Sequence, residues 1–154
     1  CNILSRKDST AMLMGKFQNS IDAKSRMIVP AKFREQLGYK CVLTMGIDRC
    51  LYIYPMAEWE KFMNKLSALP MSDANARAFI RHFYANAVES EIDKQGRITL
   101  PVDLREYANI DKELVTIGNL DKIEVWSKEE WDSKDNMTQL SPAEVSQKMV
   151  EYGI

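Results

Sequence analysis

The sequence has few of the residues that most catalytic and metal sites require. It contains one histidine, His82, beside an apolar helical stripe, and three cysteines that form no CxxC pair. Zinc takes three or four N, S or O ligands at short spacings, and Cys41 and Cys50 lie in strand-like apolar surroundings typical of reduced core thiols. The phosphate-binding patterns GxGxxG and GxxxxGK[ST] and the GxSxG nucleophile pattern are missing too. We therefore predict no enzyme, no cofactor, no metal and a partly exposed, structural His82.

Long apolar runs and a strong net charge are also absent. No segment approaches the roughly 20 apolar residues that cross a bilayer, which predicts no membrane partner. The net charge of −1 argues against a protein that coats nucleic acid indiscriminately, because such binding needs many phosphate-neutralising cations. Residues 1–11 are polar and lack the apolar core of a signal peptide. We interpret them as a disordered leader or tag remnant, and we expect a cytoplasmic location.

The most informative feature that is present is an internal repeat. The segment 21–30, IDAKSRMIVP, recurs as IDKQGRITLP at 92–101. In both copies an arginine follows the aspartate by four residues, a proline follows four later, and an Arg-Glu pair comes four after that. A repeat of this length indicates one supersecondary unit used twice.

Each copy predicts two short strands, a brief helix and a hairpin. Pro30 suits the first turn of a helix, and Gly38 suits its end because it tolerates positive φ. The expected strands are 16–21, 27–29, 41–45 and 51–54 in the first copy and 87–92, 98–100, 114–117 and 123–126 in the second, with helices 31–37 and 102–107. Each unit is too small to bury a core alone, so we predict an α+β fold in which two units complete one another as a pseudo-twofold β-barrel.

Further helices are expected outside the barrel. Apolar residues recur at helical spacing in 59–66 and 76–84, with Ser72 or Asp73 as the N-cap of the second helix. Capping-box spacings at Ser127 and Ser141 predict helices there as well, the latter running to about Tyr152. The expected organisation is a first repeat at 12–68, a linking helix at 69–86, a second repeat at 87–131, and a loose segment with a C-terminal helix at 132–154.

The repeated Asp-x-x-x-Arg motif is the candidate functional site. Asp22 and Asp93 can accept backbone N–H bonds that shape a turn and can hold Arg26 and Arg97 by charge-assisted hydrogen bonds. Each loop also carries a lysine, either Lys24 or Lys94. The planar guanidinium matches guanine O6 and N7, or a phosphate. A turn clamp without any ligand is the alternative for a single copy, but two copies favour a paired DNA-binding surface.

The two copies differ in charge. Residues 16–40 hold six basic against two acidic residues, an excess of +4, whereas 89–106 hold three against five, giving −2. We expect Lys16, Lys32 and Arg34 to add electrostatic attraction for DNA, although Arg34 and Arg105 could instead pair with nearby acids.

At these residues the sequence resembles the MraZ family of bacterial transcriptional regulators, which are built from two AbrB-like swapped-hairpin units. The resemblance covers about 12–131 and rests on DAKSRMIVPAKFRE at 22–35, IDKQGR at 92–97 and LYIYP at 51–55. It implies a nucleoid-associated ring of identical subunits that binds G-rich direct repeats of double-stranded DNA upstream of the division and cell-wall gene cluster. It also carries DNA binding over to Asp22 with Arg26 and Asp93 with Arg97.

One position departs from the family pattern. Ser25 stands where the family usually has glycine, which would cost about 1–2 kcal/mol if the turn needs positive φ. Two other functions stay open at this point. One is an antitoxin-like interaction module that grips a protein partner with residues 139–154, and the other is a structural ring whose basic loops are merely solvated.

Overall fold

The computed structural model describes residues 12–133 and 139–153. The expected leader at 1–11 and part of the expected loose segment, 134–138, lie outside these residues. The described chain has a mixed α+β fold with antiparallel strand pairs, as predicted.

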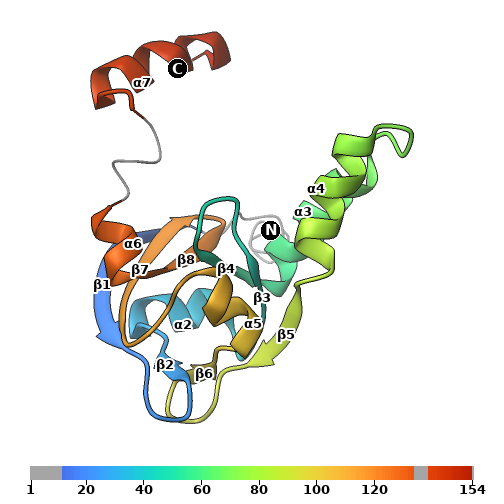
Figure 1. Ribbon diagram of the computed structural model, residues 1–154. Helices are drawn as coiled ribbons and strands as arrows, with labels where there is room; N and C mark the ends of the chain where they lie inside the picture. Colours follow the sequence, from blue (N-terminus) through green and yellow to red (C-terminus); the bar gives the residue numbers. More distant parts are fainter. Residues whose placement is uncertain (1–11, 134–138, 154) are drawn as a thin grey trace, which may run out of the picture.

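The strands form a six-stranded sheet of order β1-β7-β8-β4-β3-β5 and a two-stranded ribbon of β2 and β6 (Figure 1). Their bounds are β1 Leu13–Ser20, β2 Arg26–Ile28, β3 Lys40–Met45, β4 Leu51–Pro55, β5 Val88–Glu91, β6 Arg97–Thr99, β7 Glu113–Leu120 and β8 Lys122–Ser127. Strand β1 begins three residues before the predicted start. The other strands differ from prediction by up to three residues at an end.

Strands of the two repeats are interleaved in the six-stranded sheet, where β7 and β8 of the second repeat and β4 and β3 of the first lie between β1 of the first and β5 of the second. Strand β1 of the first repeat pairs with β7 of the second, while β5 of the second pairs with β3 of the first. The ribbon joins the corresponding strand of each repeat, with Met27 opposite Ile98 at its centre. As the repeat predicts, each unit completes the sheet of the other.

Two apolar clusters hold the elements together. The larger lies inside the sheet and ribbon and contains Phe33 and Leu104, one from the short helix of each repeat. The second cluster packs Tyr54, Phe83 and Trp126 between the sheet and two longer helices. The short helices of the two repeats therefore each place a large apolar side chain in the same core cluster.

The two short helices begin and end at the predicted residues. Helices α2 Ala31–Leu37 and α5 Val102–Tyr107 match their predicted bounds. Gly38 has φ 70° and ψ −166°, so it ends α2 at positive φ but outside the αL region. Asp73 caps α4 by accepting a hydrogen bond from the N–H of Asn75. The other helices are α3 Met56–Ser67, α4 Ala74–Tyr84, α6 Lys128–Asp132, α7 Pro142–Lys148 and the 3₁₀ turn η2 Met149–Tyr152.

The two expected capping boxes have different outcomes. Ser141 and Glu144 form the complete box. Ser127 Oγ accepts from the N–H of Glu130, but the Glu130 side chain accepts from Asn109 Nδ2 instead, so this box is only half made. The predicted C-terminal helix is α-helical only to Lys148 and then tightens into η2.

The arrangement separates three parts of the molecule. The loops that precede β2 and β6 lie together at one end, below the ribbon in Figure 1. The α3–α4 hairpin projects from one side of the sheet, and α7 is set apart from the sheet at the opposite end from the two loops.

Candidate nucleic-acid interface

The two loops have the same hydrogen-bond pattern. Asp22 Oδ1 accepts from the backbone N–H groups of Lys24 and Arg26, each at 2.9 Å, and Asp22 Oδ2 accepts from Arg26 Nε at 2.8 Å. Asp93 makes the equivalent three bonds to Gln95 and Arg97, all at 2.9 Å. The predicted Asp–Arg clamp is therefore formed twice.

The turn inside each loop needs a residue at positive φ. Ser25 has φ 63° and Gly96 has φ 80°, and each donates its N–H to the carbonyl oxygen of the loop aspartate. Serine thus adopts the conformation that glycine has in the second copy, and the first loop keeps its shape. The cost of this φ to serine is about 1–2 kcal/mol.

The loop aspartates are ionised anchors. The backbone N–H of Arg26 is the largest cause that lowers the pKa of Asp22, followed among the favourable contacts by the Arg26 guanidinium. The backbone N–H of Arg97 lowers the pKa of Asp93 in the same way. Each carboxylate stays charged at neutral pH and holds its arginine in one orientation.

The clamp uses only one edge of each guanidinium. The side chains of Arg26 and Arg97 are 26% and 27% exposed, and Nε is the atom that meets the carboxylate. Within residues 12–133 and 139–153 neither arginine's terminal nitrogens have a hydrogen-bond acceptor, and Lys24 and Lys94 have no ion pair. The two partly exposed guanidinium groups therefore keep donors that the clamps do not use, and the exposed Lys24 and Lys94 lie in the same loops.

The ribbon sets the distance between the two arginines. Arg26 lies opposite Thr99, and Arg97 lies opposite Ile28. A strand advances about 3.4 Å per residue, so the backbones of the two arginines are offset by about 7 Å along the ribbon. Sequence reasoning did not include Ile28 and Thr99 in the site, because a three-residue strand gives no sign of which face is solvent-exposed.

The three supporting cations occupy different environments. Lys16 and Lys32 are exposed, and Lys16 Nζ lies 6.0 Å from the centroid of the Trp131 ring. Arg34 is half-buried, and its Nε donates to the carbonyl oxygen of Val29 at 2.8 Å. Arg105 makes the equivalent bond to Leu100 at 3.0 Å. Both arginines thus bind carbonyl oxygens, and no ion pair to an acid is found for either in the described chain.

Each loop is docked on the opposite repeat. The N–H of Val29 donates to the Gly96 carbonyl at 2.8 Å, and the N–H of Leu100 donates to Ser25 at 2.8 Å. The Arg34 guanidinium also packs directly against Gly96, where a Cβ atom would lie 2.6 Å from Nε. The two loops are therefore fixed relative to one another through the ribbon.

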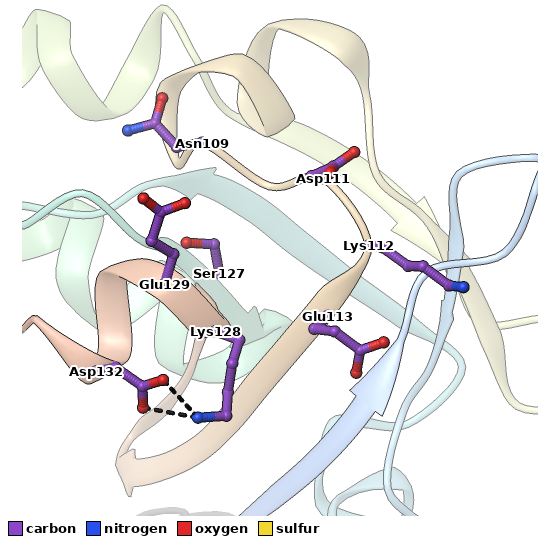
Figure 2. Close-up of a pocket in the computed structure, with 8 residues that line it drawn as sticks. All are labelled: Asn109, Asp111, Lys112, Glu113, Ser127, Lys128, Glu129 and Asp132. Carbon is purple, nitrogen blue, oxygen red and sulfur yellow. Dashed lines mark hydrogen bonds and ion pairs between the residues drawn. The ribbon is translucent and has the colours of Figure 1, made fainter.

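A shallow pocket of about 420 Å³ lies elsewhere, beside α6 and the start of β7 (Figure 2). Its charged lining residues are four acids and two lysines, and Lys128 is paired with Asp132 at 2.7 Å. This excess of carboxylates repels phosphate, so the pocket is not part of a nucleic-acid interface.

Other candidate chemistry is explained by structural contacts. Burial raises the pKa of the Cys41 thiol to about 12, as expected of an unreactive core thiol. His82 Nε2 lies 2.8 Å from the carbonyl oxygen of Gly46, which fits a partly exposed structural histidine. Among the residues that the structure describes, no group of three potential ligands could hold a metal ion, and no helix is long and apolar enough to span a membrane.

The comparisons with known proteins agree with the repeat. A family model described as "MraZ protein, putative antitoxin-like" matches residues 12–82 and again residues 83–151. The chain belongs to the MraZ family. The Transcriptional regulator MraZ of Desulforamulus reducens is 49% identical over 140 residues, which cover 91% of this chain and 99% of the relative. The protein of the same name from a Thermoanaerobacter species is 50% identical over 143 residues, covering 93% and 100%, and that from Moorella thermoacetica is 46% identical over 143 residues, covering the same shares.

Proposed function

We propose that this protein is a sequence-specific DNA-binding transcriptional regulator. Arg26 and Arg97 contact base edges in the major groove, and Lys24 and Lys94 contact phosphates. The observation that carries the proposal is the pair of matching clamps, which hold each partly exposed guanidinium by Nε. The two loops that contain the clamps lie together at one end of the molecule (Figure 1). The family membership and the names of the relatives support it.

The finer assignments belong to the same proposal. The two repeats, 12–68 and 87–131, form an AbrB-like swapped-hairpin barrel, supported by the exchange of β1 and β5 between repeats. The protein acts in the cytoplasm, on the nucleoid, as a ring that binds G-rich direct repeats upstream of the division and cell-wall genes. A ring reconciles the net charge of −1 with tight binding, because linked weak sites gain affinity from effective concentration without new contacts.

The test is fluorescence anisotropy with a duplex from upstream of the protein's own gene and a scrambled duplex of the same composition. Wild type should prefer the native duplex in a salt-sensitive manner, and Arg26→Ala should remove that preference. Lys65→Ala is the charge-matched control, since Lys65 is exposed on α3, away from the loops. Equal, weak binding of wild type to both duplexes would reject DNA recognition and leave the loops as structural clamps.

The ring has a separate test in the number of boxes. Multivalent binding predicts much tighter association with three boxes than with one. Equal affinity for one and three boxes would reject the ring while leaving DNA recognition by the single subunit intact.

A second candidate is an antitoxin-like module that binds a small protein partner through its C-terminal segment. Helix α7 stands apart from the sheet, and Val150 and Tyr152 in η2 are exposed. The name of the matching family model also includes the term antitoxin-like. A pull-down tests this candidate. Recovery of one small protein in stoichiometric amount with the full chain, but not with a chain that lacks residues 141–154, supports it. Equal recovery with the full and the shortened chain rejects it.

A further inference from the structure

The outer face of the ribbon carries two arginines and two side chains with methyl groups, an isoleucine and a threonine. Residues opposite one another in an antiparallel pair point to the same face, and neighbours along a strand alternate. Met27 and Ile98 are both 1% exposed and point into the core. Their neighbours Arg26, Ile28, Arg97 and Thr99 therefore share the outer face.

Ile28 is the unusual member of this face. Its side chain belongs to neither apolar cluster, and the residue is 51% exposed. Its backbone is held firmly, since Asn19 Nδ2 donates to the Ile28 carbonyl oxygen at 2.8 Å and Val29 is bonded to Gly96. A rigid strand thus presents a β-branched aliphatic side chain to the outside, directly beside Arg97.

The spacing of the face matches that of base pairs. Opposite residues of an antiparallel pair have Cβ atoms about 5 Å apart, so Ile28 neighbours Arg97 and Thr99 neighbours Arg26. The two pairs are offset by about 7 Å along the ribbon, which is close to two base-pair steps of about 3.4 Å. An arginine that contacts one base therefore brings its aliphatic neighbour to the same or the adjacent base pair.

Charge identifies the occupant of this face. Arg26 and Arg97 flank Ile28, and the exposed Lys24 and Lys94 lie in the adjoining loops. A twofold contact with a second copy would place this cluster against itself, and the cluster keeps an excess of two positive charges because its four cations outnumber the clamped carboxylates of Asp22 and Asp93. A polyanion with apolar groups in a groove satisfies both the charges and the aliphatic side chain, and duplex DNA is such a ligand.

We infer that Ile28 is a specificity-determining residue that contacts the 5-methyl group of a thymine next to the base bound by Arg97. Thymine carries the only methyl group in the major groove of unmodified DNA, and aliphatic side chains recognise it by apolar contact. Thr99, the equivalent residue of the second repeat, occupies the same place beside Arg26 with one methyl group and a hydroxyl. This inference rests on the proposed function and adds a base preference to it.

The experiment removes the methyl group of thymine from the DNA and shortens the Ile28 side chain of the protein. A preferred duplex is first selected from a random-sequence library with the wild-type protein. Each thymine of its box is then replaced in turn by deoxyuridine, which differs only in lacking the 5-methyl group, and affinities are measured for wild type, Ile28→Ala and Ile28→Val. Thr99→Ala is the matched control, because it truncates the equivalent side chain of the other repeat.

At the contacted thymine, the uracil substitution should weaken wild-type binding about fourfold, the factor expected for one buried methyl-sized group. Ile28→Ala should bind the thymine and uracil duplexes equally, Ile28→Val should restore the difference, and Thr99→Ala should leave it in place at that position. The dependence of affinity on salt should be unchanged in Ile28→Ala, because no phosphate contact is lost.

The failures are distinguishable. If wild type selects a sequence but no uracil substitution matters, or if Ile28→Ala loses as much at each uracil as wild type does, the inference is wrong and the proposed function stands. If Ile28→Ala changes the size of the assembly without any such coupling, Ile28 belongs to a subunit contact and the inference is again wrong. If wild type selects no sequence, the proposed function and the inference fall together.

Discussion

The turn residues Ser25 and Gly96 offer a stringent test of the loop geometry, because exchanging them should have opposite and unequal effects. Both positions have positive φ, at 63° and 80°. The Ser25 side chain makes no hydrogen bond within the described chain, whereas the place of a side chain at Gly96 is filled by Arg34. Ser25→Gly should therefore stabilise the protein, and Gly96→Ser should destabilise it by a larger amount.

The magnitudes follow from two contributions. Relief of positive φ at Ser25 gains about 1–2 kcal/mol, from which the greater freedom of glycine in the unfolded chain takes back about 0.5–1. The net gain is about 0.5–1 kcal/mol, or an increase in Tm of about 1–4 °C. Gly96→Ser incurs the same φ cost and also displaces Arg34 from the Val29 carbonyl, a charged hydrogen bond of about 1.5–3 kcal/mol. The lower freedom of serine in the unfolded chain offsets about 0.5–1 kcal/mol, so the total loss is about 2–4 kcal/mol.

The assay is urea unfolding at one fixed protein concentration, because association would otherwise shift the apparent stability. The proteins to compare are wild type, the single variants Ser25→Gly, Gly96→Ser and Arg34→Ala, and the double variant that combines Gly96→Ser with Arg34→Ala. In the double variant the serine finds space, so its cost should fall to the φ contribution less the unfolded-chain contribution, about 0.5–1 kcal/mol beyond Arg34→Ala alone. Additive effects of the two substitutions, or a neutral Gly96→Ser, would refute the argument that Arg34 fills this position.

Further predictions concern binding, acid stability and reactivity. Arg97→Ala should weaken binding to the selected duplex by about 5- to 150-fold, the range for one bidentate base contact, with little effect on a scrambled duplex in anisotropy titrations. Lys24→Ala should weaken binding to both duplexes alike and make the slope of log K against log salt shallower by about 0.9. The pKa values of Asp22 and Asp93 are lowered in the folded protein, so the stability that these carboxylates contribute is fully present above the unfolded value of about 3.8. This contribution is lost as the pH falls through the lower folded values. In urea titrations, wild type should therefore lose more stability than Asp22→Asn between about pH 5 and pH 2. Cys41, with a pKa of about 12, should resist iodoacetamide at pH 8 in the native protein and react in urea, as followed by mass spectrometry of its peptide.

The features that sequence predicted well are those set by local chemistry. Pro30 and Gly38 bound α2 at the expected residues, because each restricts or permits one backbone angle. The Asp22–Arg26 clamp follows from spacing alone, since a turn of four residues brings the carboxylate onto the N–H and Nε of the arginine. Both arguments need only a few consecutive residues.

The features that sequence missed depend on contacts between the repeats. The carbonyl that binds Arg34 and the glycine beneath its guanidinium are placed by the docking of one repeat on the other. The exposure of Ile28 depends on the register of β2 against β6, and a strand of three residues has too little alternation to reveal it. The positive φ of Ser25 does not follow from its own sequence for another reason. Serine adopts this strained conformation only where the surrounding hydrogen bonds impose it.

The duplication within one chain has a consequence for the DNA that the proposed function implies. A homodimer with one loop per subunit presents two identical halves, and twofold symmetry then favours an inverted repeat. Here the two halves have the same backbone fold but different side chains. The first half has Ser25, Ile28 and a segment with an excess of basic residues, and the second has Gly96, Thr99 and a segment with an excess of acidic residues. Under the proposed function, each subunit would therefore bind an asymmetric box in one orientation. In the proposed ring, identical subunits related by a rotation about the ring axis would present that orientation repeatedly, so selected DNA should contain boxes arranged head to tail and not palindromes.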